Sequence, residues 1–265
     1  MKKFKIIFIT DTHMGFSKVN DIAQEQMLMA ISEEKPDLIV HTGDIGSHAT
    51  ICIDRFFSLL RLTPGLEKTK VLACLGNHDW WKPIAETQCF SPELSLEENK
   101  AVMERCNIKY AGDGTGYSYL LKDNNTLTVF GLDGWYHSDP LTNDGRMIPG
   151  YYTGGIEWLR KRANNDFTKI IDLAEKKKSE NKDNINILAT HFGFLKSERD
   201  KDWKAQQSGQ YFGGNPRFED NLKDIDYLAT GHAHMFYETV ASNGTTQCFS
   251  PGSDYEFPRF KILEV

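Results

Sequence analysis

A series of short apolar runs, rich in β-branched residues, most constrains how this 265-residue chain folds. The runs are KIIFIT (5–10), LIVHTG (38–43), KVLACLG (70–76), LTVFGL (127–132), INILAT (185–190), DYLATG (226–231), QCFSPG (247–252) and FKILEV (260–265). Polar or Gly residues bound each run, as is typical of buried β-strands. Helix-like stretches at about 19–34 and 50–62 separate the first three runs. This alternation predicts an α/β fold with parallel strands early in the chain.

Apolar residues at helical spacing also predict a long amphipathic helix over 155–178. Its expected outer face is basic and carries Arg160, Lys161, Arg162, Lys169 and Lys176 to Lys178. Asp166, Asp172 and Glu175 interrupt this positive charge, which favours a solvated helix face over a nucleic-acid surface. A capping box of Ser95 and Glu98 predicts that another helix begins at Ser95.

Composition and charge limit the class of protein. A hydrophobic content of 40% and an aromatic content of 12% are enough for a large core. The net charge of −6 argues against a non-specific nucleic-acid binder, although a nuclease stays open. The five cysteines include no Cys-x-x-Cys pair, so we expect free thiols in a reducing compartment. No segment approaches the roughly 20 apolar residues that cross a bilayer, so we expect a cytoplasmic protein without a membrane partner.

No repeat, low-complexity segment or linker rich in Pro, Gly or Ser divides the chain. We therefore expect a single domain over residues 1–265. Irregular stretches at about 80–93, 134–154 and 193–224 are expected to be loop insertions over one edge of the fold. The sequence makes no prediction of oligomeric state.

Polar side chains stand where the apolar runs end. In chain order they are Asp11, His13, Asp44, Asn77, His78, Asp79, His191, His232 and His234. Because ligands of open α/β sheets bind beyond the carboxyl ends of the strands, we expect these groups to converge. Five of the eight histidines belong to this set, and clustered His and Asp residues are typical of a functional site.

The donor types predict a metal centre. Carboxylate, amide and imidazole donors without sulfur suit Mn²⁺, Fe or Zn²⁺ better than a Ca²⁺ site or a thiolate site. The set is too large for one catalytic metal that keeps an open position. It fits two metals about 3.5–4 Å apart, bridged by a carboxylate and by a hydroxide that acts as the nucleophile.

The same residues resemble the sequence blocks of the calcineurin-like metallophosphoesterases, in the family's order. The blocks are Asp11-x-His13, Gly43-Asp44, Gly76-Asn77-His78-Asp79, His191 and Gly231-His232-x-His234, and Pro251-Gly252-Ser253 is similar to a late family segment. The resemblance implies a four-layer α/β/β/α sandwich of two mixed sheets flanked by helices.

The resemblance also implies a role for each residue. Asp11, His13 and His234 would hold one metal, and Asn77, His191 and His232 the other. Asp44 would bridge the two metals. His78 would stabilise the phosphoryl oxygens or protonate the leaving group, and Asp79 would orient His78.

Departures from the family pattern narrow the expected class. Protein phosphatases of this superfamily carry an Arg soon after Gly-Asp and another before Gly-Asn-His, whereas this chain reads GDIGSHAT and has Leu75 before Gly76. We therefore expect in-line hydrolysis of a small or nucleotide phosphomonoester or phosphodiester by the metal-bridging hydroxide. Mn²⁺ is the expected metal, with Fe, Zn²⁺ and Ni²⁺ as alternatives. A nuclease acting on single-stranded nucleic acid and a non-catalytic scaffold that retains the fold stay open.

Several residues beside these blocks are candidates for substrate binding. They are His48, Trp80, Trp81, Trp135 and Arg217. Each has a structural alternative, since tryptophans often pack in cores and the other two fit a helix start and a surface loop. Asp133 ends the fourth apolar run, but the ligand set is complete without it. We expect Asp133 to be at most a hydrogen-bond acceptor for a ligand histidine, or a turn residue whose side chain caps the following loop.

Overall fold

The structure, a computed structural model, describes residues 3–47, 49–80, 91–135, 156–195 and 214–265. Two β-sheets form its centre. The first has the strand order β11-β1-β2-β3-β4 and the second has the order β5-β6-β7-β8-β10-β9. The strands of the first sheet are β1 (Lys5–Ile9), β2 (Leu38–His41), β3 (Lys70–Ala73), β4 (Lys109–Tyr110) and β11 (Phe260–Glu264). Those of the second are β5 (Asp113–Leu120), β6 (Thr126–Leu132), β7 (Ile185–Thr190), β8 (Tyr227–Ala229), β9 (Tyr237–Val240) and β10 (Gln247–Ser250).

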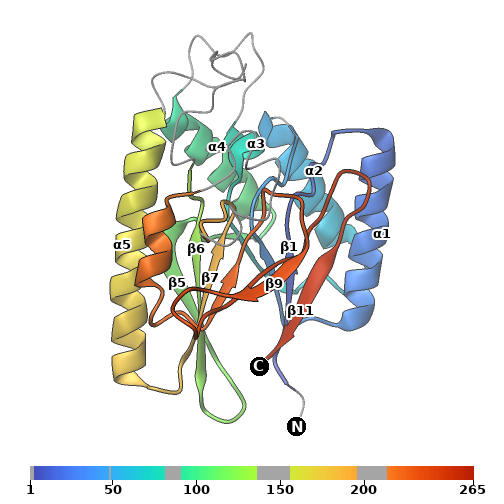
Figure 1. The fold of residues 1–265 in the computed structure, drawn as a ribbon. Helices are drawn as coiled ribbons and strands as arrows, with labels where there is room; N and C mark the ends of the chain where they lie inside the picture. Colours follow the sequence, from blue (N-terminus) through green and yellow to red (C-terminus); the bar gives the residue numbers. More distant parts are fainter. Residues whose placement is uncertain (1–2, 48, 81–90, 136–155, 196–213) are drawn as a thin grey trace.

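Helices cover the outer faces of both sheets. They are α1 (Lys18–Glu34), α2 (Ala49–Leu62), α3 (Asn77–Trp80), α4 (Pro92–Arg105), α5 (Ile156–Glu180) and the 3₁₀ helix η2 (Pro216–Asn221). Helix α5 lies on one side of the sheets, and α1 and α2 lie on the other (Figure 1). The predicted four-layer sandwich of two mixed sheets is therefore confirmed.

The alternation of side chains along β1 explains how the layers hold together. Ile6 and Phe8 belong to the core cluster between the two sheets, together with Val129 of β6. Ile7 and Ile9 belong to the cluster beneath the helices of the first sheet. Because successive side chains of a strand point to opposite faces, an all-apolar run is buried on both sides.

Pairing within the sheets brings the carboxyl ends of several strands to one edge. Strands β1, β2, β3 and β4 are mutually parallel, as are β6, β7, β8 and β10. Antiparallel strands β11, β5 and β9 close the outer edges. The parallel pairing predicted for the early strands is confirmed, and the polar strand ends meet at one edge.

The capping-box prediction is wrong. Helix α4 begins at Pro92, because the Ser91 side chain accepts a hydrogen bond from the Leu94 backbone N–H at 3.3 Å. Ser95 lies inside the helix and is buried. Proline suits the first helical turn, where its missing N–H costs nothing, so the earlier cap is favoured.

Most of the predicted insertions at 80–93, 134–154 and 193–224 lie outside the described residues, as do Trp81 and His48. Cys52, Cys74, Cys106 and Cys248 are free thiols. Among the helices described, no segment combines the length and the apolar character that a bilayer span requires.

Candidate metal centre

The predicted ligands converge at the carboxyl edge of the sheets and are held in strained backbone conformations. Asp11, His13, Asp44, His232 and His234 all have positive φ, between 42° at His13 and 69° at His232. Residues other than glycine adopt this left-handed region at a cost, and they persist there only where their surroundings fix them. The strain therefore marks this edge as a functional site.

Glycines of the motifs allow these loops to approach one another. A Cβ atom on Gly76 would lie 2.1 Å from Oδ1 of Asp44, and one on Gly231 would lie 1.9 Å from Oγ1 of Thr10. Both distances are far below van der Waals contact. Glycine is therefore required at both positions, because the backbone must pass beside buried polar groups.

The first cluster of donor atoms contains Asp11, His13 and His234, all within 4.8 Å of one another. Nε2 of His13 lies 3.3 Å from Nε2 of His234, which lies 3.5 Å from Oδ1 of Asp11. Strands β1 and β8, which belong to different sheets, thus supply one compact group of ligands.

The second cluster contains Asp44, His191 and His232, also within 4.8 Å of one another. Nε2 of His191 lies 3.2 Å from Nδ1 of His232 and 3.4 Å from Oδ2 of Asp44. The amide oxygen of Asn77 lies 3.1 Å from the same His191 nitrogen. Oδ2 of Asp44 also lies 3.6 Å from Nε2 of His13, so this carboxylate joins the two clusters.

The chemistry of this donor set fits divalent metals. Burial first of all lowers the pKa of His13 and His232 well below the usual range, so both rings stay neutral. Burial by itself would raise the pKa of Asp44, but His191 and other neighbouring histidines hold it well below its usual range. Two facing imidazole nitrogens can share only one proton, whereas a cation satisfies every lone pair. Burial by itself would lower the pKa of His191, but Asp44 raises it to about 9, so a bound metal would replace the proton of that ring. Neutral histidines and ionised carboxylates are the forms that bind metal.

His78 borders the clusters from the solvent side, with 17% of its side chain exposed. Its backbone N–H donates to Oδ1 of Asp44 at 2.8 Å, and its Nε2 lies 4.0 Å from Oδ2 of the same carboxylate. Its Nδ1 lies 3.0 Å from the carbonyl oxygen of Ser47. The ring is therefore fixed on one side and accessible on the other, as a group that meets substrate must be.

Asp79 acts on the backbone around His78. Its carboxylate accepts hydrogen bonds from the N–H groups of Ile45, Gly46 and Gly76, at 2.8 to 3.2 Å. Ser47, whose carbonyl meets the His78 ring, directly follows Gly46. Asp79 thus holds the loop whose Ser47 carbonyl meets the His78 ring. Burial and the neighbouring Asp44 raise the pKa of Asp79 to about 7.

Trp80 and Trp135, two of the predicted substrate-binding residues, are buried. Trp80 is only 1% exposed and packs edge-on against Trp158, with ring centroids 6.3 Å apart. Trp135 is 5% exposed and packs against Phe192 at 5.8 Å. Both rings belong to the core under α4 and α5, which is the packing alternative that the sequence left open for these tryptophans. Arg217 lies on η2 with an exposed side chain.

Asp133 is a hydrogen-bond acceptor, but the partners that the structure gives it differ from the expected ligand histidine. Its carboxylate accepts from the Leu75 N–H at 2.7 Å, from the Tyr110 hydroxyl and from Nη1 of Arg162 at 3.1 Å. Arg162 was expected on the outer face of its helix, yet its side chain is only 14% exposed. The reason is that the buried carboxylate attracts the guanidinium inward, directly behind the Gly76-Asn77-His78 motif.

Sequence reasoning missed two residues at this edge, Asp254 and Tyr255. Oδ1 of Asp254 lies 3.1 Å from Nδ1 of His234, a position from which a carboxylate orients a ligand histidine. The Tyr255 ring lies 4.6 Å from the His13 ring and 5.0 Å from the His234 ring. Their only sequence signal is that they directly follow the Pro251-Gly252-Ser253 segment.

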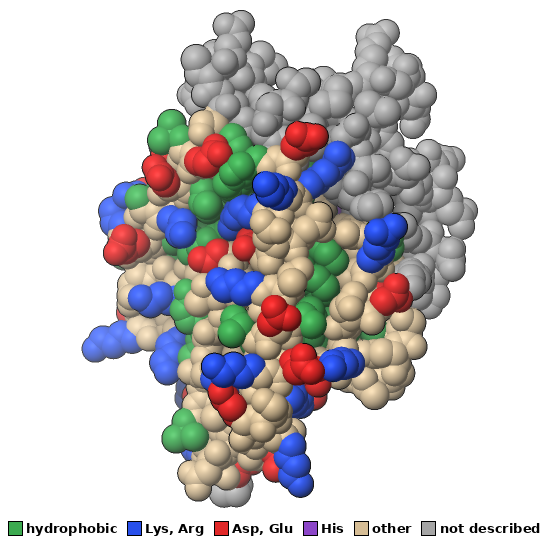
Figure 2. All heavy atoms as spheres, turned by 90° about the vertical axis from the view of Figure 1, so that its left-hand side faces the viewer, with side chains coloured by type: hydrophobic (Ala, Val, Ile, Leu, Met, Phe, Trp, Pro, Cys, Tyr) green, Lys and Arg blue, Asp and Glu red, His purple; other side chains and the backbone are tan. Residues whose placement is uncertain are grey.

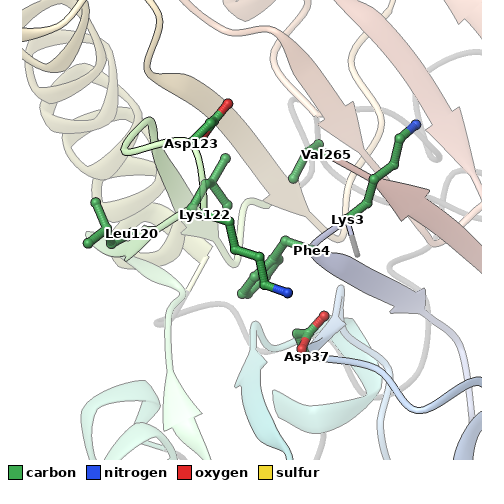
Figure 3. Close-up of a pocket in the computed structure, with 8 residues that line it drawn as sticks. Lys3, Phe4, Asp37, Leu120, Lys122, Asp123 and Val265 are labelled. Atoms are coloured by element: carbon green, nitrogen blue, oxygen red, sulfur yellow. The ribbon is translucent and has the colours of Figure 1, made fainter. Parts of the chain in front are cut away.

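A surface pocket lies at the opposite end of the strands (Figure 3). Lys3 and Phe4 precede β1, Asp37 precedes β2, and Lys122 and Asp123 lie in the turn before β6. Since the metal-ligand clusters follow the carboxyl ends of the strands, this pocket is separate from them.

The face formed by α5 carries charges of both signs in the view of Figure 2. Lys178 pairs with Asp226 at 2.9 Å, Lys223 with Glu175 at 3.2 Å, and Lys176 lies 3.8 Å from Glu180. This pairing supports the interpretation of a solvated helix face.

Comparisons with known proteins agree with this geometry. Residues 4–236 match the family described as calcineurin-like phosphoesterase. The chain belongs to this family, and it is a metal-dependent phosphoric ester hydrolase. No curated protein shows a significant sequence match.

Solved structures with the same fold share little sequence with the chain. Phosphopantetheinyl hydrolase from Mycobacterium tuberculosis is 16% identical with a TM-score of 0.66, over 99% of this chain and 96% of that one. A dimetal phosphatase from Danio rerio is 12% identical with a TM-score of 0.58, over 100% and 93%. A putative 5′-nucleotidase from Staphylococcus aureus is 14% identical with a TM-score of 0.56, over 98% of this chain but only 50% of that one.

Proposed function

We propose that this protein is a binuclear phosphoesterase that hydrolyses a small phosphomonoester or phosphodiester, nucleotides included, with Mn²⁺ as the preferred metal. The observation that carries this proposal is that Asp44 belongs to one donor cluster and its Oδ2 lies 3.6 Å from Nε2 of His13 in the other. Asp11, His13 and His234 would hold one metal, and Asn77, His191 and His232 the other. Bound divalent metals supply positive charge for the phosphoryl group and lower the pKa of bound water.

The side chains around the clusters have their own tasks. Asp44 is ionised and lies between both groups of histidines, so it holds them at one spacing. His78 reaches the site from the solvent side, where its Nε2 can donate a hydrogen bond to a phosphoryl oxygen or to the departing oxygen. Asp79 holds the loop after Asp44 against the loop that carries Asn77, because its carboxylate accepts hydrogen bonds from the N–H groups of Gly46 and Gly76. Asp254 behind His234 favours one orientation of that ring.

Small substrates are favoured over single-stranded nucleic acid. The charges on the α5 face are paired, and the chain has a net charge of −6. A nucleic-acid channel usually needs a continuous positive groove. The structural relatives named as a phosphatase and a putative nucleotidase support a small phosphorylated substrate. The free buried thiols of Cys74 and Cys248 support a cytoplasmic location.

The test compares the wild-type protein with Asp44→Asn after reconstitution with Mn²⁺. We expect two metal ions per wild-type chain and hydrolysis of p-nitrophenyl phosphate or bis-p-nitrophenyl phosphate. Asp44→Asn should bind less metal and lose about 100-fold in kcat/KM, the effect of removing one essential electrostatic group. Asp183→Asn, at an exposed position before β7, is the matched control. Equal activity in wild type and Asp44→Asn would overturn the proposal.

A further inference from the structure

Two aromatic side chains stand beside the first ligand cluster, and they come from different loops. Tyr255 follows β10, and Phe16 follows β1. The Tyr255 ring packs against the imidazoles of His13 and His234, with centroid distances of 4.6 and 5.0 Å and interplanar angles of 31° and 39°. Phe16 lies on Tyr255 at 4.2 Å with an angle of 34°. The two rings therefore continue the surface of the ligand histidines outward.

Hydrogen bonds between the two loops fix this arrangement. The Ser17 hydroxyl donates to Oε1 of Glu256 at 3.0 Å, and the Glu256 N–H donates to Oδ1 of Asn20 at 3.1 Å. Asn20 in turn donates to the carbonyl oxygens of Thr12 and His13 at 3.0 and 2.9 Å. The aromatic pair is thus tied to the same backbone that carries a ligand, so its position relative to the ligands is set.

The exposure of Phe16 has no structural benefit. Its side chain is 52% exposed, although the ring would gain from burial. Met235 and Phe236, which directly follow His234, are 44% and 54% exposed, and Phe257, two residues after Tyr255, is 70% exposed. An exposed apolar group at the rim of a site is typical of a surface that a ligand covers.

The charges beside the rings limit what that ligand can be. Asp254 and Glu256 flank Tyr255 in the chain, and both carboxylates are exposed to solvent. They disfavour a further phosphate at this position. An uncharged ring fits, because aromatic pairs gain from offset or edge contact beyond the area that they bury.

We propose that Phe16 and Tyr255 form a subsite for the ester group of the substrate, and that this group carries an uncharged aromatic ring. The inference rests on the proposed phosphoesterase function and specifies its substrate class. Phosphate esters with such a ring are expected to be preferred over esters of short alkyl alcohols and over polyphosphates.

The experiment uses a pair of esters with alkyl leaving groups. Release of inorganic phosphate by the Mn²⁺-loaded protein is measured for 2-phenylethyl phosphate and ethyl phosphate. For diesterase activity, release of methyl phosphate from the corresponding methyl diesters is measured. The wild type is expected to prefer the phenyl compound through a lower KM. In Phe16→Ala and in Tyr255→Leu, the ratio of kcat/KM values between the two substrates should fall roughly threefold to tenfold.

The variants and controls separate the outcomes. Leu120→Ala changes an exposed side chain in β5 near the opposite end of the strands, and it should keep the wild-type ratio. Phe16→Ala removes an exposed side chain, so it tests the idea even when Tyr255→Leu disturbs the metal site. An unchanged ratio in Phe16→Ala, or a wild type without preference, would overturn the subsite alone. No Mn²⁺-dependent hydrolysis by the wild type would overturn the proposed function as well.

Discussion

His41 gives the protein a specific sensitivity to acid. Its side chain is buried in β2, and its two ring nitrogens have different hydrogen-bonding roles. Nδ1 accepts a hydrogen bond from the Gly43 N–H at 3.1 Å, so the proton of the neutral ring is on Nε2. That nitrogen donates to Thr12 Oγ1 at 3.0 Å, and the Thr12 hydroxyl donates to the Ile45 carbonyl at 2.9 Å. A second proton on Nδ1 would face a backbone N–H.

The size of the stability loss in acid follows from the pKa of the His41 ring. Burial first, and then the charge of His191, lower the pKa of His41 from 6.5 to about 3. Because the folded-state pKa is depressed, the stability from this group is present above pH 6.5 and is lost as the pH falls towards 3. The slope is about 1.4 kcal/mol per pH unit, and the full loss is on the order of 5 kcal/mol. That is a large part of the 5–15 kcal/mol typical of whole domains.

Urea unfolding of wild type and His41→Gln between pH 4.5 and 6.5, both with excess chelator, measures this contribution. Glutamine keeps a polar group in the strand but does not titrate. The free energy of unfolding of the variant should fall less steeply with decreasing pH, by about one proton or 1.4 kcal/mol per pH unit. Parallel curves for the two proteins would refute the reasoning.

Other predictions concern the support of the metal site. Asp133→Leu removes the partner of the buried Arg162 guanidinium at 3.1 Å and leaves it, among the described residues, only the Asp166 carboxylate at 3.4 Å, so it should cost about 3 kcal/mol in urea unfolding. The double variant that also carries Arg162→Met should recover much of the lost free energy of unfolding. If the single and double variants lose the same stability, the pairing of Asp133 with Arg162 is contradicted. Gly76→Ala places a Cβ 2.1 Å from Oδ1 of Asp44, so metal content should fall at least about tenfold while the circular dichroism spectrum persists. A normal metal content would count against this packing argument. Removal of metal with a chelator should lower the unfolding temperature. Addition of Mn²⁺ at 100 times its Kd should raise the free energy of unfolding by about 2.7 kcal/mol. An unfolding temperature insensitive to metal would argue against a preformed site.

Local sequence patterns were sufficient to predict most strands, the long helix and the candidate ligand set. Each predicted strand is present, because a short β-branched run must be buried on both faces wherever it lies. The helix predicted over 155–178 is present as α5, Ile156–Glu180. The ligands could be named because each directly follows such a strand. Ser91 and Ser95 could each cap the start of α4. The turn before the helix favours Ser91, so the predicted start at Ser95 was wrong.

Contacts between segments far apart in the chain were decided by the tertiary structure alone. The inward position of Arg162 on α5 depends on Asp133, which directly follows β6. The place of Tyr255 beside His13 depends on loops more than two hundred residues apart. Burial of Trp80 and Trp135 follows from the packing of α5, which sequence spacing does not place.

By itself, then, the sequence determined most strands, the long helix, the candidate metal-ligand set and, through its motifs, the family. Those properties depend on neighbouring residues and on the periodicity of burial. The tertiary structure alone decided which charges are buried behind the two clusters and which aromatic rings border the site. These depend on how separate loops meet at the edge of two facing sheets, where a side chain's surroundings come from the whole fold.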